Sequence, residues 1–111
     1  MNKTPIEVFE YRTGDGKNPF QEWLFGLRDR EARARVLVRL NRIRLGNFGD
    51  CGNVGGGVSE LRIHYGPGYR VYFGRMGDAA VLLLCGGDKR TQARDIAAAQ
   101  QYWADHLGRM Q

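Results

Sequence analysis

The chain is poor in the residues that build metal sites, disulfide frameworks and membrane spans. Its 111 residues include two cysteines and two histidines. Cys51 and Cys85 lie far apart and form no Cys-x-x-Cys pair, so the spacing encodes no metal site. The longest apolar run, residues 79–85, is too short to cross a bilayer, and the first five residues lack the apolar stretch of a secretory signal. We therefore expect a reduced, cytoplasmic protein with no metal, no cofactor and no membrane partner.

Acidic residues are also outnumbered. Asp and Glu total 12 against 17 Lys and Arg, which gives a net charge of +5, and arginine greatly exceeds lysine. A guanidinium group binds phosphate or carboxylate through two hydrogen bonds, so this composition favours a polyanionic or acidic partner. The length suits one domain, residues 1–111, which is large enough to form a core without disulfides.

Periodicity and cap residues place the first and last elements. Alternation over residues 6–11 predicts a strand, and Asn18 followed by Pro19 predicts the start of a short helix. The unbroken apolar residues 79–85 predict a strand that is buried on both faces and central in the sheet. Helical spacing after this strand predicts a last helix, which Trp103 anchors to the core.

A second helix is expected to begin after Asp29, its N-cap, and to end at Gly46. Its apolar face consists of Ala32, Val36, Leu40 and Ile43. Beside this face runs a stripe of four arginines, Arg28, Arg35, Arg39 and Arg42. The stripe fits either an ordinary solvated helix edge or a ridge that faces phosphate. Residues 46–57 are rich in glycine and have no apolar pattern, so we expect a mobile loop there.

The most informative stretch is residues 60–73, because its alternation separates two faces of a hairpin. Gly66-Pro67-Gly68 predicts the turn, so the flanking strands are antiparallel. With Tyr65 opposite Tyr69, one register satisfies both faces. On the apolar face this register pairs Ile63 with Val71 and Leu61 with Phe73. On the polar face it pairs His64 with Arg70 and Arg62 with Tyr72, and Glu60 also belongs to that face.

The polar face of the hairpin has two readings. Antiparallel sheets often leave one face in water, where charged neighbours are ordinary. However, three cationic or titratable groups with a single carboxylate repel one another unless an anion binds. A phosphate backbone is the obvious anion. Residues 86–92, which include Lys89 and Arg90, likewise form either a plain capped loop or an anion site at a helix N-terminus.

The expected order is strand, helix, helix, three antiparallel strands and helix. This order gives an α+β domain whose helices pack on one face of a twisted, mainly antiparallel sheet and leave the other face open. On four segments the chain resembles the RelE/ParE superfamily of toxins, and more closely its HigB-like, phage Gp49-like branch of addiction-module killer proteins. The four segments are residues 19–24, 58–63, 66–73 and 83–92.

This resemblance implies a single RelE-like domain that acts as the toxin of a type II toxin-antitoxin pair. Such a toxin is a ribosome-dependent mRNA endonuclease, and its implied partners are mRNA on the ribosome and a small antitoxin encoded beside it. Two other readings stay open. One is a ParE-like inhibitor of DNA gyrase that does no chemistry, and the other is a non-enzymatic module that binds RNA or protein.

Metal-independent RNA cleavage uses the adjacent 2′-hydroxyl as nucleophile, so the protein must move two protons and stabilise charge on the phosphate. Arg70 matches the family's strand arginine and is expected to hold the scissile phosphate, with Arg62 beside it. Lys89 matches a basic position of the family and could add charge or a proton. His64 is the acid-base candidate, because histidine ordinarily titrates near neutrality. Tyr72 could stack on a base or steer a proton.

The candidates for RNA binding outside this cluster are Arg28, Arg35, Arg39, Arg42 and Arg90. The chain lacks the lysine-rich central strand of RelE itself, so the identity of the general base stays open. For the antitoxin we expect an acidic or apolar segment that covers either the basic face or the helices around Trp23 and Leu24.

Overall fold

The computed structural model describes residues 4–111, and the first three residues of the expected domain lie outside the described residues. One sheet has the strand order β1-β5-β4-β3-β2, with β1 parallel to β5 and every other pair antiparallel. The expected α+β class with a mainly antiparallel sheet is therefore confirmed. The elements are β1 (Glu7–Glu10), α1 (Pro19–Gly26), α2 (Arg30–Arg44), β2 (Cys51–Gly55), β3 (Val58–Ile63), β4 (Tyr69–Met76), β5 (Ala80–Asp88), a 3₁₀ turn (Lys89–Thr91) and α3 (Gln92–Arg109).

Both predicted helix starts are confirmed by their caps. The side chain of Asn18 accepts a hydrogen bond from the Gln21 N–H at 3.0 Å, with Pro19 in the first turn of α1. The carboxylate of Asp29 accepts from the Glu31 N–H at 2.9 Å and starts α2. These caps fix where α2 begins, and so fix which of its side chains face the sheet.

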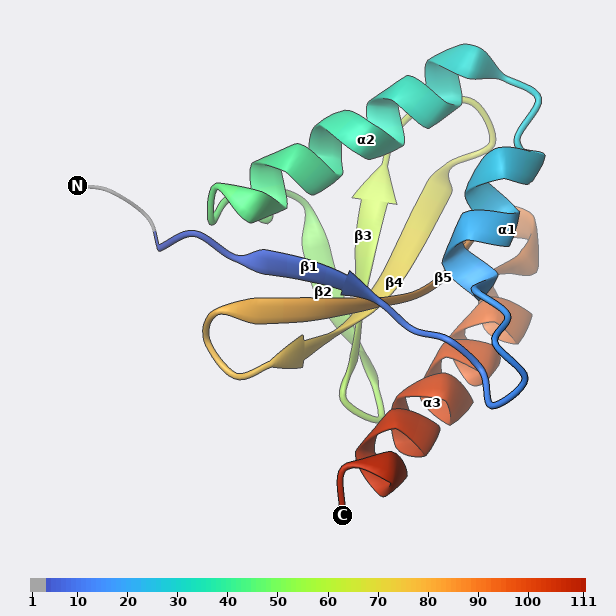
Figure 1. Cartoon of the computed structure of the whole chain (residues 1–111). Helices are drawn as coiled ribbons and strands as arrows, with labels where there is room; N and C mark the ends of the chain where they lie inside the picture. Colours follow the sequence, from blue (N-terminus) through green and yellow to red (C-terminus); the bar gives the residue numbers. More distant parts are fainter. Residues whose placement is uncertain (1–3) are drawn as a thin grey trace.

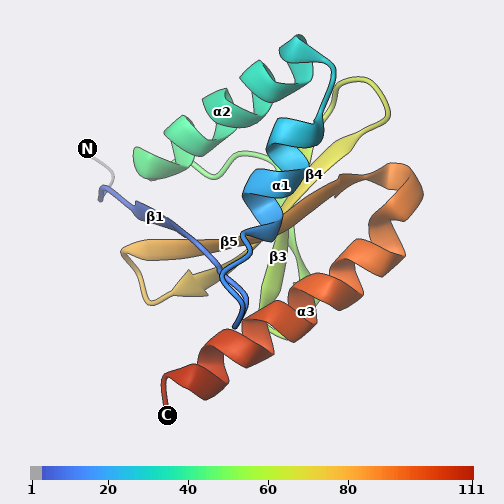
Figure 2. The ribbon, with the colours of Figure 1, turned by 45° about the vertical axis from the view of Figure 1, so that its right-hand side comes forward.

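The helices lie on both faces of the sheet, which differs from the expectation that all would share one face. Helices α1 and α2 pack on the face that carries Leu61, Val71 and Phe73. Helix α3 packs on the opposite face through Trp103, against a cluster that includes Tyr72. Figures 1 and 2 show the strands between α2 and α3. Part of the face that we expected to be open is therefore covered.

The hairpin of β3 and β4 keeps the expected faces but not the expected register. Arg62 lies opposite Arg70, Ile63 opposite Tyr69, and Leu61 opposite Val71, so each pair is shifted by two residues from the prediction. Side chains alternate with a period of two, and a shift of two residues therefore leaves every side chain on its face. The longer turn uses positive φ at Gly66 (56°) and Gly68 (81°).

Residues 46–57, expected as a loop, contain the edge strand β2, which pairs antiparallel with β3. This edge strand, Cys-Gly-Asn-Val-Gly, is held by backbone hydrogen bonds to its neighbour and needs no apolar alternation. The prediction that residues 79–85 form a buried strand inside the sheet is confirmed. Strand β5 lies inside the sheet between β1 and β4, and Leu83 and Leu84 are fully buried. No helix in residues 4–111 is long and apolar enough to span a membrane.

Candidate functional site

A hollow of about 440 Å³ opens at the tip of the β3–β4 hairpin, and we call it the tip hollow. It brings together four of the five side chains predicted to be catalytic, which come from β3, the turn, β4 and the segment after β5. These four are Arg62, His64, Arg70 and Lys89, and the hollow is completed by Ile63, Tyr65, Gly66, Pro67 and Gly68.

Glu60 is the buried carboxylate that holds the two arginines of the tip hollow. It is 2% exposed. Its Oε2 accepts from Arg62 Nε at 3.0 Å, and its Oε1 accepts from Arg70 Nε at 3.1 Å and from Gln92 Nε2 at 2.6 Å. Arg70 also donates from Nη1 to the Gly68 carbonyl at 2.7 Å. Two guanidinium groups are thus fixed side by side on a rigid strand pair.

Tyr72, the fifth predicted catalytic residue, does not line the tip hollow. Its ring is fully buried in the cluster under α3, and its hydroxyl donates to Glu60 Oε1 at 3.4 Å. Burial, followed by the Glu60 charge, raises the pKa of Tyr72 above its usual range. A ring without exposed surface has no face on which a base could stack, so Tyr72 supports Glu60 from the core.

Asp50, in the segment before β2, does not line the tip hollow but contacts two of its residues, Arg62 and His64, and the sequence reasoning missed it. Its Oδ1 accepts from Arg62 Nη1 at 2.9 Å, and its Oδ2 lies 2.5 Å from His64 Nε2. The hydrogen bond from His64, followed by the one from Arg62, lowers the pKa of Asp50. The bond to Asp50 raises the pKa of Arg62. The surplus of cations on the hairpin, which the sequence analysis assigned to a bound phosphate, is balanced in part by this carboxylate.

The contact with Asp50 also defines the histidine tautomer. An ionised carboxylate can only accept, so His64 Nε2 carries the hydrogen, and in the neutral ring Nδ1 is then the acceptor, which makes no hydrogen bond within residues 4–111. The His64 side chain is 76% exposed, so this nitrogen is accessible from solvent. The pair can therefore take a proton from a bound group.

The segment after β5 contributes Lys89 to the tip hollow and forms a capped turn, which was one of its two predicted readings. Lys89 is exposed, and within residues 4–111 it has no carboxylate within 4 Å. Asp88 caps the 3₁₀ turn that precedes α3, because it accepts from the Arg90 N–H at 2.8 Å and pairs with Arg90 Nη2 at 3.0 Å, whereas Thr91, the N-cap of α3, makes no side-chain cap hydrogen bond. Arg90, predicted to bind RNA, is thus paired with Asp88 while its side chain stays 79% exposed.

The arginine stripe of α2 divides into residues with different surroundings. Arg35, Arg39 and Arg42 line a second hollow of about 310 Å³, which we call the α2 groove, whereas Arg28 does not line it. Arg39 is bound to the backbone, since it donates to the carbonyls of Phe48 and Asp50 at 3.2 Å each and also to that of Arg62. Burial lowers the pKa of Arg39.

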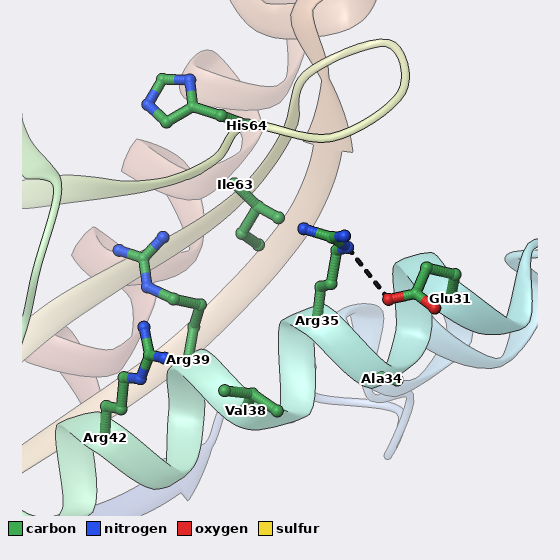
Figure 3. Close-up of a pocket in the computed structure, with 8 residues that line it drawn as sticks. All are labelled: Glu31, Ala34, Arg35, Val38, Arg39, Arg42, Ile63 and His64. Carbon is green, nitrogen blue, oxygen red and sulfur yellow. Dashed lines mark hydrogen bonds and ion pairs between the residues drawn. The ribbon is translucent and has the colours of Figure 1, made fainter.

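The α2 groove is shown in Figure 3, where the arginine side chains rise from α2 toward His64. Its complete lining is Glu31, Ala34, Arg35, Val38, Arg39, Arg42, Ile63 and His64. Ile63 and His64 also line the tip hollow, so the two hollows meet at the hairpin. Within residues 4–111, no group of three His, Cys, Asp or Glu side chains is placed to hold a metal ion.

Comparison with known proteins identifies the family. Residues 22–103 match the family model described as "Phage derived protein Gp49-like", a family within the RelE-like toxin group. The chain is also 47% identical over 81 residues to an uncharacterized protein of Haemophilus influenzae, and the match covers 73% of this chain and 82% of that protein. Residues 22–103, matched by the family model, include β3, β4, β5 and the whole lining of the tip hollow. The chain therefore belongs to the phage-derived Gp49-like family.

Proposed function

We propose that this chain is the HigB-like toxin of a type II toxin-antitoxin pair, and that it cuts mRNA on the ribosome in the cytoplasm. The observation that carries the proposal is the tip hollow, where Arg62, Arg70, His64 and Lys89 surround one cavity on a rigid hairpin. The membership of the Gp49-like family supports the toxin class. The cluster offers charge and a proton acceptor at one place, which is what transesterification of RNA requires.

The two fixed arginines hold the scissile phosphate in this proposal. Arg62 and Arg70 each donate Nε to Glu60, and each uses Nη1 for a second protein oxygen. Neither Nη2 donates a hydrogen bond within residues 4–111, so both are left for phosphoryl oxygens. Charge-assisted hydrogen bonds from positioned guanidinium groups stabilise the extra negative charge of the pentacovalent phosphorane.

His64 and Lys89 move the protons. The free Nδ1 of His64 accepts the proton of the RNA 2′-hydroxyl, and the resulting imidazolium is stabilised by Asp50. The 2′-oxygen then attacks the phosphorus, and the bond to the 5′-oxygen breaks. Lys89 donates a proton to that 5′-oxygen, so the products are a 2′,3′-cyclic phosphate and a 5′-hydroxyl. None of these steps requires a metal ion or an organic cofactor.

The test is primer extension on total mRNA after a short induced pulse of the protein, compared with Arg70→Ala. We expect cuts within translated reading frames, and at least a roughly 100-fold loss of cutting in Arg70→Ala, because one transition-state donor is removed. Arg94→Ala is the matched control. It also removes one arginine, but its side chain is 78% exposed and does not line the tip hollow.

Other results would contradict the nuclease. Intact transcripts together with blocked replication would indicate a gyrase inhibitor, and intact transcripts without growth arrest would indicate a binding module.

The proposed partner is an antitoxin encoded next to this chain. We expect that its co-expression abolishes the cuts and that deletion of its gene makes this chain lethal. Harmless expression of the folded wild-type protein without that gene would contradict this partner.

A further inference from the structure

We propose that the α2 groove binds a nucleobase of the same RNA strand whose phosphate lies in the tip hollow, an inference that rests on the proposed function. The first argument is continuity. Ile63 and His64 line both hollows, so a strand that places a phosphate beside Arg70 passes over the hairpin and reaches the groove with its neighbouring nucleotide. Figure 3 shows His64 on one side of the groove and the arginines of α2 on the other.

The second argument is the chemistry of the groove. Its apolar surface comes from Ala34, Val38 and Ile63, which suits the flat face of a base. Arg35 lies with its guanidinium carbon 4.5 Å from the centre of the Tyr65 ring. A guanidinium has two faces, and the one not covered by Tyr65 is free to stack on a base, as arginines do in single-stranded RNA recognition.

The third argument is charge. The single carboxylate of the groove, Glu31, is paired with Arg35 at 3.0 Å. Arg42 forms no ion pair or side-chain hydrogen bond within residues 4–111, so it is available to the phosphate that follows the bound base. An apolar floor bordered by cations matches a nucleotide, which combines a flat apolar ring with a negative phosphate. RNA therefore fits the groove better than an uncharged apolar peptide does.

Two neighbouring residues of α2 provide a matched pair of variants. Val38 is 46% exposed and lines the groove, whereas Leu37 is 48% exposed and does not. Val38→Glu and Leu37→Glu add the same charge to the same helix, and glutamate is a good helix former, so both variants are expected to fold. Only Val38→Glu places a carboxylate where the base and its phosphate would lie.

The experiment measures binding of a single-stranded 2′-O-methyl oligoribonucleotide, which cannot be cut because its 2′-oxygens are blocked. We expect Val38→Glu to weaken binding about ten-fold and Leu37→Glu to change it less than about two-fold. In a second series, an abasic spacer replaces one nucleotide at a time. One spacer position should weaken binding to the wild type by about ten-fold and have no further effect on Val38→Glu.

Three outcomes would overturn the base site. They are equal affinities of the two variants for the oligoribonucleotide, an abasic series in which no position weakens binding, and no binding of the oligoribonucleotide by the wild type. Unchanged RNA binding by Val38→Glu together with escape from the antitoxin would assign the groove to a protein instead. The oligoribonucleotide cannot be cut, so the base site is tested separately from the nuclease. If Val38→Glu and Leu37→Glu bind RNA with equal affinity while transcript cutting still depends on Arg70, the nuclease proposal holds and only the base site is excluded.

Discussion

At the scale of single residues, Glu60 is the most consequential, because it holds two arginines of the tip hollow. Its carboxylate accepts hydrogen bonds from Arg62, Arg70, Tyr72 and Gln92 while being 2% exposed. Removal of a buried carboxylate leaves its cationic partner without a countercharge. This lowers the free energy of unfolding by more than the intact ion pair contributes to it. Glu60 thus links the stability of the sheet to the geometry of the site.

We expect Glu60→Gln to lower the free energy of unfolding by about 3 kcal/mol, because Arg70, whose side chain is 13% exposed, loses its countercharge. Urea unfolding measures this change. Glu31→Gln is the control, since Glu31 is an exposed partner of Arg35 on α2 and should change the stability by less than about 0.5 kcal/mol. Equal unfolding midpoints for the two variants would show that Glu60 does not support the fold.

At the scale of elements, two glycines allow the helices to approach the sheet from opposite sides. A Cβ on Gly86 of β5 would lie 2.2 Å from the Trp23 ring of α1, and a Cβ on Gly74 of β4 would lie 2.3 Å from the Trp103 ring of α3. Each tryptophan therefore lies on a strand that has no side chain at that point. These contacts decide how closely α1 and α3 pack.

We expect Gly86→Ala to destabilise the protein by about 1–3 kcal/mol, since the added methyl group overlaps the Trp23 ring and α1 must move. Gly108→Ala in α3 is the opposite case. Nothing lies within 4 Å of its Cβ position, and alanine is the better helix former, so a gain of about 0.5–1 kcal/mol is expected. Urea unfolding measures whether Gly86→Ala lowers the free energy of unfolding and Gly108→Ala raises it. A Gly86→Ala variant as stable as the wild type would contradict the tight contact.

At the scale of the whole molecule, the carboxylates with shifted pKa values predict the response to acid. Hydrogen bonds lower the pKa of Asp15, Asp29, Asp50 and Asp88. A carboxyl group whose pKa is lower in the folded state contributes stability above its unfolded pKa of about 3.9, and this contribution is lost as the pH falls through the folded pKa. These four groups therefore stabilise the protein at neutral pH and not in acid.

We expect the urea midpoint to be nearly constant between about pH 7 and pH 5 and to fall below about pH 4. Asp29→Asn should reduce this acid dependence, because asparagine still caps α2 but does not ionise. Unfolding curves at several pH values for both proteins measure the difference. An Asp29→Asn variant with the full wild-type acid dependence would exclude Asp29 as a contributor.

Much of the fold follows from local patterns. The caps Asn18 and Asp29 locate α1 and α2, because a cap needs only the next three residues. Strand β2 was not predictable in this way, since its hydrogen bonds are to β3 and its sequence has no apolar alternation. The face of α3 was not predictable either, because it depends on the space above Gly74.

The sequence by itself determined which side chains share a face of the hairpin, and hence that Arg62 and Arg70 point the same way. This holds because alternation with period two is a local property of each strand. The register was decided by the tertiary structure, since a shift of two residues preserves every face. The partners of the arginines were also decided there. Asp50 contacts His64, which is 14 residues away in the chain, and Gln92 contacts Glu60, which is 32 residues away. Such contacts are formed by tertiary packing, and no local pattern predicts them.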